Sequence, residues 1–460
     1  MSAPGENLTV LCRTSVSPST GAAADHRLPL TFFDILWLYF HPIQRLLLYP
    51  YPCSTDTFLQ KIAPNLKNSL SKTLNRYLPL AGNLIVPQNS DLPELLYSPG
   101  DSVLVTFAES NGDIDFSSLT GNHPRNSDQF HSLVPDFPDP KSEIGFVKIP
   151  VLAVQITLFP QTGISIGITN HHSSGDASSI VGFIKTWSSY ANLAVGHEID
   201  NETDNENLLP RPIYDRSLIK DPLGLTEIFW AQMRADKIGL PASKSPPNKL
   251  RATFVLRKHE IEMLKNLLTA RNPGQAHISS FTVIASYVWA CLSKSIGPIK
   301  DDEPEYFVFA VDARGRVDPP LPEGYFGNCV AAVLTDFKHG DLRSENGFFE
   351  AAKVIGEVIA NKVNNKEELF RGADEWLTSY GPLLGKRLFG VAGSPRFDLY
   401  DGADFGLGKP KKYEAVSIDW GGSMSLCKSR EFEGGLEIGL SLVKEEMDAF
   451  VPLFYHGLKM

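Results

Sequence analysis

The chain has 460 residues, of which 42% are hydrophobic and 21% charged, and this ordinary globular composition argues against extensive disorder. The formal net charge of -10 and the lack of a dense Lys/Arg stripe argue against nucleic acid as a partner. A small anionic ligand needs only a local group of cations, such as Lys249, Arg251, Arg257 and Lys258.

The length exceeds what one hydrophobic core usually serves, so two domains are expected. The five cysteines form no Cys-x-x-Cys pair, and their odd number indicates a reducing compartment. The first residues have neither the basic segment nor the long apolar segment of a signal peptide. No apolar run reaches the roughly 18 residues that span a bilayer. We therefore expect a cytoplasmic monomer without membrane contact.

The N-terminal half mixes helices and strands. Leucines four residues apart predict a helix over 66–78. Alternating apolar residues predict strands over 151–159 and 164–169, joined by a turn. The apolar spacing then returns to that of a helix over 177–194.

An acidic, Asn-rich stretch at 196–210 has little to bury and predicts a solvated linker. It suggests two domains, over 1–195 and 226–460, joined by a crossover over 196–225. The C-terminal half repeats the mixture of the first, although no close repeat is visible. Its predicted elements are strands over 252–256 and 306–312, three short strands between 413 and 443, and helices over 259–268, 279–294, 347–363 and 444–458.

The segment with the clearest chemistry is TNHHSSGDASS at 169–179, between a predicted strand and a predicted helix. Rigid scaffolds often present catalytic groups on loops of this kind. His172 precedes Asp176 by four residues, across a turn in which Gly175 permits unusual backbone angles. A neutral imidazole there can act as a base near pH 7. The spacing also occurs by chance, so taken alone it leaves a structural histidine as the alternative.

Two other kinds of chemistry fit this region less well. Residues 163–167 match Gly-x-Ser-x-Gly, but that motif needs a sharp turn at the serine, and the apolar alternation continues through Ser165. His171, His172 and Asp176 are residues of types that bind metals, yet a well-spaced further ligand is missing. We expect neither a serine nucleophile nor a metal site.

Three further segments stand in a matching order along the chain, LTFFDILWL at 30–38, YFGNCV at 325–330 and ADFGLGKP at 403–410. With the His-x-x-x-Asp motif they make the chain resemble the plant BAHD acyltransferases. More narrowly, it is similar to the branch that acylates anthocyanins and other phenolic glycosides, often with malonyl groups. The resemblance implies an α/β fold that is chloramphenicol acetyltransferase-like. Two similar domains would each have a mixed β-sheet with flanking helices, with a solvent channel between them.

The resemblance also implies roles for individual residues. His172 would be the general base, and Asp176 would pair with Arg314 to support its turn. Asp404 begins the segment that matches the family's Asp-Phe-Gly-Trp-Gly motif, which is sometimes given a catalytic role, although a structural role in its loop is favoured here. Leu407 stands where the family usually has Trp.

Three residues correspond by resemblance to contacts with the acyl-CoA co-substrate. Lys249 would meet the phosphates, and Ser279 and Ser280 would lie near the pantetheine arm. Each has a structural alternative, because lysines are often merely solvated and serines before a helix often cap it. No permanently bound cofactor is implied.

The implied reaction is acyl-CoA-dependent O-acyl transfer without a covalent acyl-enzyme. The expected substrates are malonyl-CoA and a sugar hydroxyl of a phenolic glucoside. The helix after the motif begins ASSIVGF and offers no cation to a malonyl carboxylate. A hydroxycinnamoyl donor such as coumaroyl-CoA therefore stays open. An ester or acyl-CoA hydrolase and a non-catalytic phenolic-binding protein are the remaining alternatives.

Overall fold

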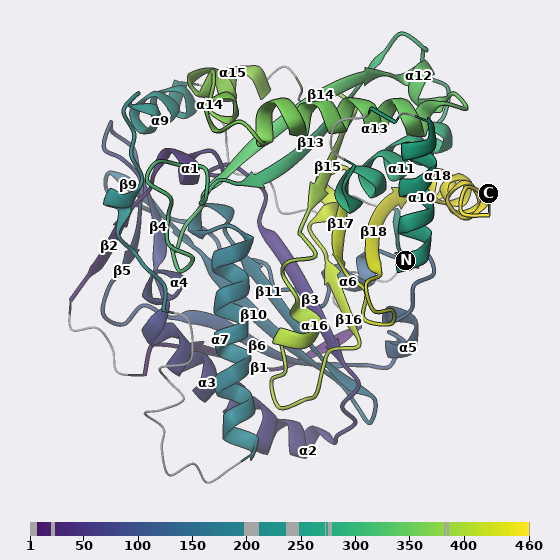
Figure 1. Cartoon of the computed structure of the whole chain (residues 1–460). Helices are drawn as coiled ribbons and strands as arrows, with labels where there is room; N and C mark the ends of the chain where they lie inside the picture. The colour runs from purple at the N-terminus through teal and green to yellow at the C-terminus, as the bar shows by residue number, and fades with distance from the viewer. Residues whose placement is uncertain are drawn as a thin grey trace.

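Strands from both halves of the chain form three β-sheets in the computed structural model (Figure 1). The structure describes residues 7–19, 24–196, 211–235, 248–271, 273–274, 278–380, 383 and 386–459. Residues 197–210 of the predicted acidic linker lie outside these ranges.

The first sheet has six strands in the order β1-β6-β10-β11-β3-β16. It is mixed, because β10 runs parallel to β6 but antiparallel to β11. Both β10 and β11 are buried over their whole length, and they confirm the two strands predicted there. The strands are β1 (Leu8–Val16), β3 (Ile43–Tyr49), β6 (Val103–Ser110), β10 (Leu152–Phe159), β11 (Gly163–Asn170) and β16 (Lys412–Ala415).

Two long helices, α3 (Ala63–Arg76) and α7 (Ala177–Gly196), pack together beside this sheet (Figure 1). The predicted leucine stripe is buried through Leu74, but α3 ends before Leu78. Tyr77 leaves the helical conformation at φ -116° and ψ 49°, and a separate short helix, α4 (Leu78–Ala81), follows with Pro79 in its first turn. Pro79 has no N–H to continue the hydrogen bonds of α3, and its ring would clash with the carbonyl four residues earlier, which explains the break.

The second sheet has seven strands in the order β14-β13-β15-β17-β18-β12-β7. It is also mixed, since β13 is antiparallel to β14 and parallel to β15. The strands predicted in the C-terminal half are all present. The seven are β7 (Arg125–Asn126), β12 (Lys249–Leu256), β13 (Pro304–Asp312), β14 (Val330–Lys338), β15 (Leu388–Ala392), β17 (Ser423–Lys428) and β18 (Leu436–Val443).

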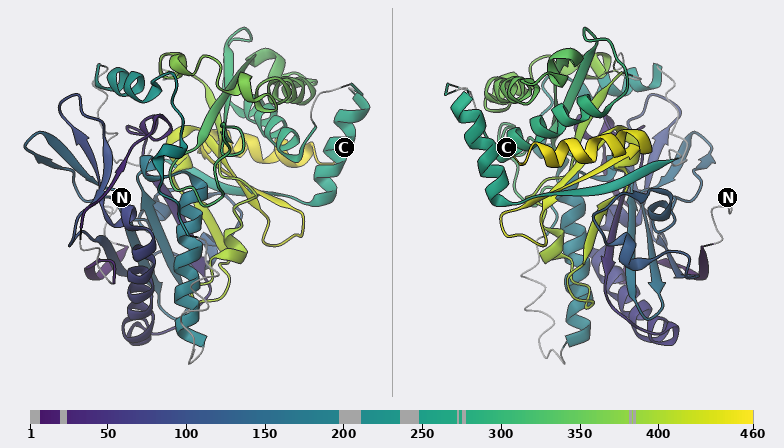
Figure 2. Two further views of the ribbon diagram at one scale, coloured as in Figure 1. Left: turned by 60° about the vertical axis from the view of Figure 1, so that its left-hand side comes forward. Right: turned by 90° about the vertical axis from the view of Figure 1, so that its right-hand side faces the viewer.

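The predicted helices of the C-terminal half flank this second sheet (Figure 2). The almost wholly apolar helix is α11, and most of its side chains are buried, as expected of a helix that is apolar all round. The helices are α10 (Lys258–Arg271), α11 (Ser280–Ser295), α13 (Gly347–Val358), which continues as the π-helical turn η4 (Ile359–Val363), and α18 (Lys444–His456).

A third sheet of short antiparallel strands, in the order β2-β5-β4-β9-β8, was not predicted. Its strands have three to five residues, too few for an alternating pattern to stand out. They are β2 (His26–Pro29), β4 (Asn83–Pro87), β5 (Glu94–Tyr97), β8 (Lys141–Glu143) and β9 (Phe146–Pro150).

Short helices and turns connect these elements. They are α1 (Phe32–Ile35), α2 (Thr55–Thr57), η1 (Phe58–Ile62), α5 (Phe116–Leu119), α6 (Asp128–His131), η2 (His172–Ser174), η3 (Arg216–Leu218), α9 (Leu225–Ala235), α12 (His339–Arg343), α14 (Lys366–Leu369), η5 (Ala373–Glu375), α15 (Trp376–Tyr380), α16 (Leu399–Gly402) and α17 (Ile418–Gly421).

Each large sheet is completed by a strand from the other half of the chain. β16 pairs with β3 at the edge of the first sheet, and β7 pairs with β12 at the edge of the second. Buried ion pairs accompany this exchange: Arg125 and Arg251 each donate to a carboxylate oxygen of Glu414, at 2.9 and 3.1 Å. The predicted α/β class with mixed sheets is confirmed, whereas the proposed domain boundaries remain a prediction.

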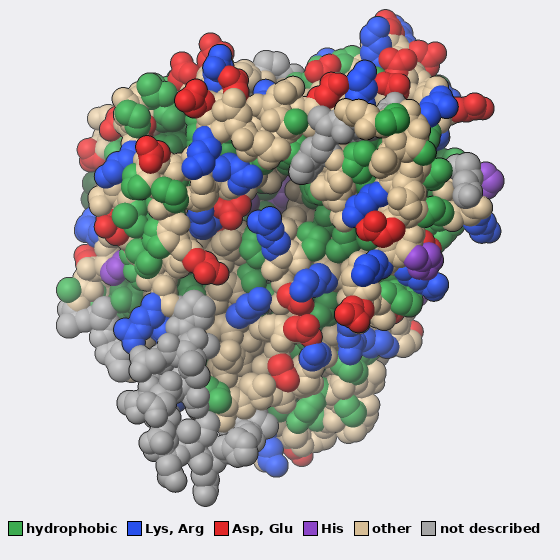
Figure 3. Space-filling model, in the orientation of Figure 1, with side chains coloured by type: hydrophobic (Ala, Val, Ile, Leu, Met, Phe, Trp, Pro, Cys, Tyr) green, Lys and Arg blue, Asp and Glu red, His purple; other side chains and the backbone are tan. Residues whose placement is uncertain are grey.

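The surface offers no dense basic stripe on the face drawn in Figure 3, where acidic and basic side chains are interspersed. The same face is hollowed near its centre. Within the described ranges, no helix combines the length and the apolar character needed to cross a membrane.

Candidate active site

His172 lies on the turn between β11 and α7, as the sequence predicts. A single 3-10 turn, η2, forms there, with Ser174 Oγ donating to the carbonyl of His171 at 2.6 Å. Gly175 has φ +157°, and a Cβ atom placed on it would lie 2.8 Å from Cβ of Ser179. Any side chain at this position would push α7 away from the turn, so glycine fixes the close approach of the two.

The ion pair expected between Asp176 and Arg314 is present. Arg314 donates through both terminal nitrogens to the two carboxylate oxygens, at 2.7 and 3.0 Å. Asp176 also accepts from the backbone N–H of Cys329 at 3.1 Å and of Ser179 at 3.2 Å. Burial lowers the pKa of Arg314, but Asp176 outweighs that effect and the pKa is raised. The carboxylate is fully engaged with the protein and does not face the base.

Two of the segments that carried the resemblance meet at the same turn. Asn328, from YFGNCV, donates its side-chain N–H to the carbonyl of His172 at 3.0 Å. Its backbone and side-chain N–H groups also donate to Asp34, from LTFFDILWL, at 2.8 and 3.0 Å. Asp34 is fully buried and closes the capping box of α1 with Thr31. A chain of contacts thus runs from α1 through Asn328 to the backbone of His172.

The imidazole of His172 is held by aromatic rings. Trp37 stacks on it, with centroids 3.9 Å apart and planes 8° from parallel, and Phe40 meets it edge-on at 5.4 Å. Burial lowers the pKa of His172 to about 3, an effect that the positive charge of Arg45 reinforces and the carbonyl of His172 itself opposes. The ring is therefore neutral near pH 7 and able to accept a proton.

The two ring nitrogens of His172 differ in environment. Nδ1 is buried, and no other described residue forms a hydrogen bond with it. The carbonyl of His172 itself lies nearby. The side chain as a whole is partly exposed, which leaves Nε2 as the nitrogen open to solvent. A proton on Nδ1, facing that carbonyl, places the lone pair on Nε2, where a substrate hydroxyl can reach it.

The two rival chemistries find no support in the geometry. Ser165 lies in the middle of β11, wholly buried and without a turn, so it forms no nucleophile elbow. In the part of the chain that the structure describes, no group of three or more His, Cys, Asp or Glu side chains could hold a metal ion.

Asp404 is not brought to His172. Its Oδ1 accepts from the N–H groups of Gly406 and Gly408, at 2.9 and 3.0 Å, and so closes its own loop. That loop is attached to Tyr49, whose hydroxyl donates to the carbonyl of Ala403 at 2.7 Å.

Tyr49 pairs with Ile164 at the start of β11, whereas His172 follows the end of that strand at Asn170. At about 3.3 Å per residue, the six steps from Ile164 to Asn170 separate the Asp404 loop from His172 by roughly 20 Å. Leu407, in place of the family's usual Trp, is 5% exposed and packs in the core. The geometry favours a structural role for this loop.

Each of the three residues matched to acyl-CoA contacts has a protein partner or a position in a helix of its own. Lys249 Nζ donates to the carbonyl of Asp419. Ser279 caps α11, its hydroxyl accepting from the N–H of Thr282 at 3.1 Å, and Ser280 is the first residue of that helix. Both serines remain partly exposed, so their contact with a ligand stays a prediction.

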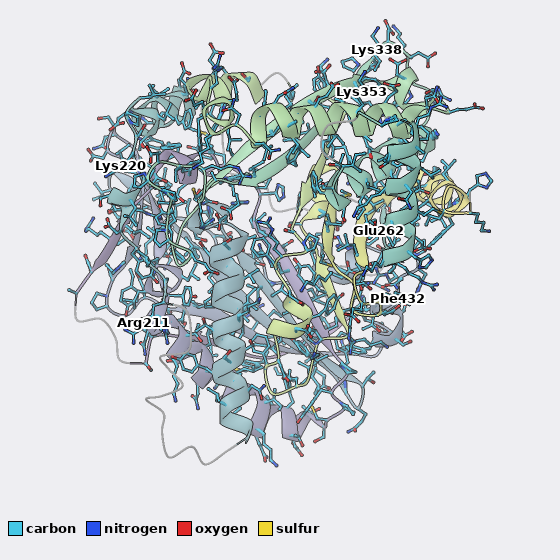
Figure 4. The ribbon with its side chains drawn as sticks, viewed as in Figure 1. Arg211, Lys220, Glu262, Lys338, Lys353 and Phe432 are labelled. Carbon is cyan, nitrogen blue, oxygen red and sulfur yellow. The ribbon has the colours of Figure 1, made fainter. Side chains whose placement is uncertain are left out.

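The four cations suggested as an anion-binding group do not form one. Arg251 is 1% exposed and bonded to Glu414 and Asp419. Arg257 lies beyond the far end of β12 from Lys249 and covers the ring of Phe432 at 4.6 Å; Phe432 is labelled in Figure 4. The sequence placed these residues together, but an extended strand spreads them over some 25 Å.

Three residues beside His172 were not singled out by the sequence analysis, namely Trp37, Asn328 and Arg45. Trp37 and Asn328 lie inside LTFFDILWL and YFGNCV, so the resemblance contained the signal without a role for either. Arg45 follows shortly after the first segment, in β3. Only the fold shows that these positions surround one imidazole.

A neutral histidine on a strand-to-helix turn, braced by an arginine from the other half of an α/β fold, can supply the base that an acyl-CoA-dependent O-acyltransferase needs, and the relatives of this chain show that it is such an enzyme. The sequence pattern of the Transferase family matches residues 6–456. The chain belongs to this family, the BAHD acyltransferases.

Similar proteins are found across nearly the full length. The chain is 47% identical to malonyl-coenzyme:anthocyanin 5-O-glucoside-6'''-O-malonyltransferase of Salvia splendens, over 97% of this chain and 95% of that protein. It is 44% identical to phenolic glucoside malonyltransferase 1 of Nicotiana tabacum, over 98% and 99%. It is 36% identical to coumaroyl-CoA:anthocyanidin 3-O-glucoside-6''-O-coumaroyltransferase 2 of Arabidopsis thaliana, over 96% of each.

Solved structures share the fold at lower identity. Vinorine synthase superposes with a TM-score of 0.70 at 21% identity, covering 96% of each chain. TRI101 of F. sporotrichioides, solved with coenzyme A and T-2, superposes with a TM-score of 0.65 at 15% identity, covering 93% of this chain and 97% of that one. The predicted two-domain acyltransferase fold is confirmed.

Proposed function

We propose that this chain transfers the malonyl group of malonyl-CoA to a sugar hydroxyl of a phenolic glucoside, with His172 as the general base. The observation that carries the proposal is the identity of 40–47% with three malonyltransferases that act on anthocyanin or phenolic glucosides, over nearly the whole chain. The site supports it, because a neutral imidazole with an open Nε2 is the group that such a reaction needs.

The reaction follows from the geometry of His172. Nε2 takes the proton of the acceptor hydroxyl as its oxygen attacks the thioester carbonyl. The imidazolium that forms faces the ring of Trp37, and an aromatic face attracts a cation. When the tetrahedral intermediate collapses, the C–S bond breaks and His172 returns its proton to the departing thiolate. Asp176, Arg314 and Asn328 position the turn and do not react.

A direct transfer without an acyl-enzyme is the second part of the proposal. Among the described residues, no serine or cysteine side chain is hydrogen-bonded to the imidazole of His172; Ser173 and Ser174 beside it are buried, and Ser174 donates to the carbonyl of His171. Burial raises the pKa of the Cys329 thiol, which makes it a poor nucleophile. Both substrates must then be bound together, and initial-rate kinetics should be sequential, whereas ping-pong kinetics would contradict the scheme.

The remaining expectations belong to the same proposal. Malonyl-CoA is a co-substrate, contacted by Lys249, Ser279 and Ser280, and the two substrates enter a channel between the halves from opposite sides. We further propose a cytoplasmic monomer. All five cysteines are free, which agrees with a reducing compartment.

A coumaroyl donor is the second candidate, because coumaroyltransferases of Arabidopsis thaliana are 36% identical to this chain. One experiment separates the candidates. Purified protein is incubated with malonyl-CoA or p-coumaroyl-CoA, with and without a flavonoid glucoside, and thiol release and product mass are measured. Glucoside-dependent release and a mass gain of one malonyl group are expected. A coumaroyl product would favour the second candidate, and release without glucoside would indicate a hydrolase.

A further inference from the structure

In the part of the chain that the structure describes, one buried arginine has no acidic partner. Among the described residues, four arginine side chains are buried: Arg45, Arg125, Arg251 and Arg314. Arg125 pairs with Glu414, Arg251 with Glu414 and Asp419, and Arg314 with Asp176. Arg45 is 9% exposed, and no carboxylate of the described residues lies within ion-pair distance of it. An unpaired buried cation is costly, and its retention calls for an explanation.

Arg45 lies beside the catalytic turn. It is in β3, opposite Ile168 of β11 and Ala415 of β16. Its Nη1 donates to Oδ1 of Asn170, two residues before His172, at 2.7 Å. It also shares a hydrogen bond with Tyr413. Both partners are neutral, so the guanidinium is oriented by the protein but its charge is not balanced.

The electrostatics agree with this geometry. Burial lowers the pKa of Arg45, whereas the pKa values of Arg251 and Arg314 are raised, since their carboxylate partners outweigh burial. The charge of Arg45 also lowers the pKa of His172, in keeping with its hydrogen bond to Asn170, two residues before the histidine. An anion bound to Arg45 would lie close to the reacting atoms.

We propose that Arg45 binds the free carboxylate of a dicarboxylic acyl donor and thereby selects malonyl-CoA over donors with an uncharged acyl group. This inference rests on the proposed function and names the residue that sets its donor. A malonyl carboxyl carbon is two bonds from the thioester carbonyl, so its carboxylate must lie beside the base when the hydroxyl attacks. A guanidinium fits a carboxylate through two parallel hydrogen bonds. The helix after the His-x-x-x-Asp motif offers no cation to a malonyl carboxylate, and Arg45 of β3 supplies one instead.

The proposal couples donor choice to catalysis. A bound malonyl carboxylate neutralises Arg45 and removes one of the charges that lower the pKa of His172. His172 is then a stronger base when the malonyl donor is in place than when an acetyl donor is. Replacing Arg45 should therefore lower selectivity and also raise the pKa of the acid limb of the rate with acetyl-CoA.

The test compares wild type with Arg45→Gln and Arg45→Lys. Binding of malonyl-CoA and acetyl-CoA is measured calorimetrically without acceptor. Any difference between the two affinities then comes from the carboxylate of the donor, because no acceptor carboxylate is present. kcat/KM for each donor is then measured with a flavonoid glucoside. Loss of a hydrogen-bonded charge should reduce the malonyl-to-acetyl preference of Arg45→Gln by about 30-fold. Arg45→Lys keeps the positive charge but loses the paired N–H donors of the guanidinium, so its malonyl-to-acetyl preference should lie between those of wild type and Arg45→Gln.

Arg316→Gln is the matched control, because Arg316 donates to the carbonyls of Asp312 and Val363 and, among the described residues, forms no hydrogen bond with the turn that carries His172. If Arg45→Gln does not fold, Asn170→Asp replaces it, since that change gives Arg45 a carboxylate of its own and should likewise lower malonyl preference.

An equal loss for both donors, or an unchanged preference, would overturn the role of Arg45. A wild type that makes no malonylated product refutes the proposed function instead. The binding measurement still decides the inference in that case: it stands if wild type binds malonyl-CoA more tightly than acetyl-CoA and Arg45→Gln does not, and it fails if wild type binds both alike.

Discussion

Arg314 donates hydrogen bonds to Asp176 from both of its terminal nitrogens, although the two residues are 138 positions apart in the chain. The pair connects the turn that carries His172 to the loop after β13, in the other half of the molecule. A carboxylate bonded in this way has no lone pair directed at substrate. Asp176 therefore serves in the motif by holding the turn in place.

Replacing Asp176 with Asn should destabilise the protein strongly, because it leaves the guanidinium of Arg314 buried without its counter-charge. Breaking a buried pair in this way costs about 3–5 kcal/mol. Asp312→Asn is the control: Asp312 meets the same arginine at 3.4 Å, but its side chain is 48% exposed, and an exposed pair is worth about 0–1 kcal/mol. Urea unfolding would measure both, and equal losses would contradict the structural role of Asp176.

His172→Ala should lower kcat/KM by at least about 100-fold, the loss typical of a missing general base. The melting temperature should change little, because the imidazole accepts and donates no hydrogen bond to another side chain among the described residues. Ser165→Ala serves as the matched control for the rejected nucleophile and should stay within about threefold of wild type. Substantial activity in His172→Ala would place the base elsewhere.

Trp37→Leu should lower kcat more than KM, because Trp37 faces the imidazolium that forms only during the reaction. A cation–π contact of about 0.5–2 kcal/mol predicts a loss of roughly 2- to 30-fold. The smaller side chain also admits water, so the acid limb of the pH-rate profile should move up towards 6.5. Trp37→Phe keeps an aromatic face and should lose less. Equal losses in both variants, with an unmoved pH profile, would show that Trp37 only fills space.

The three histidines at the site should make stability fall in mild acid. Burial lowers the pKa of His41 and His171 to about 4 and of His172 to about 3. An unfolded histidine takes up its proton near pH 6.5, so between about pH 6.5 and 4 the unfolded state binds more protons than the native state. Each such histidine then costs up to about 1.4 kcal/mol of stability per pH unit as the pH falls, and nothing above that window.

Urea unfolding at pH 7, 6 and 5.5 would show this slope. His171→Asn keeps an acceptor for the N–H of Ser173 and should make the slope shallower by close to one proton. His259, which is exposed on α10, provides the control when replaced by Asn. A slope that is identical in wild type and His171→Asn would refute the buried, neutral state of His171.

Sequence patterns were sufficient for the long elements and for the place of His172 on its turn. β10, β11, α7 and α11 were predicted because burial imposes a strict period on strands and helices of eight residues or more. The five-stranded sheet was missed because its strands are too short to show one. The exchange of β7 and β16 between the large sheets was also missed, since pairing across hundreds of residues leaves no local pattern.

The site divides in the same way. His172, Asp176 and Arg314 could be named because a motif carries them. Trp37 and Arg45 could not, because an apolar aromatic and a lone arginine in a strand are ordinary in sequence and become exceptional only through what they face. The four cations around β12 mark the opposite error, where closeness in sequence suggested a cluster that an extended backbone separates.

Asp404 tests whether the catalytic role sometimes given to its motif or the structural role favoured by its position is correct. Its carboxylate holds the N–H groups of Gly406 and Gly408, both with positive φ, near 78°, and the loop lies roughly 20 Å from His172. Asp404→Ala removes the acceptor of both bonds and should cost about 1–3 kcal/mol of stability. Asp404→Asn retains an oxygen in the same place and should cost less. Both variants, assayed well below their melting temperatures, should keep kcat within about threefold of wild type. A fully folded Asp404→Asn that lost 100-fold in kcat would instead require this loop to reach the substrate, which its attachment to Tyr49 at the far end of β11 opposes.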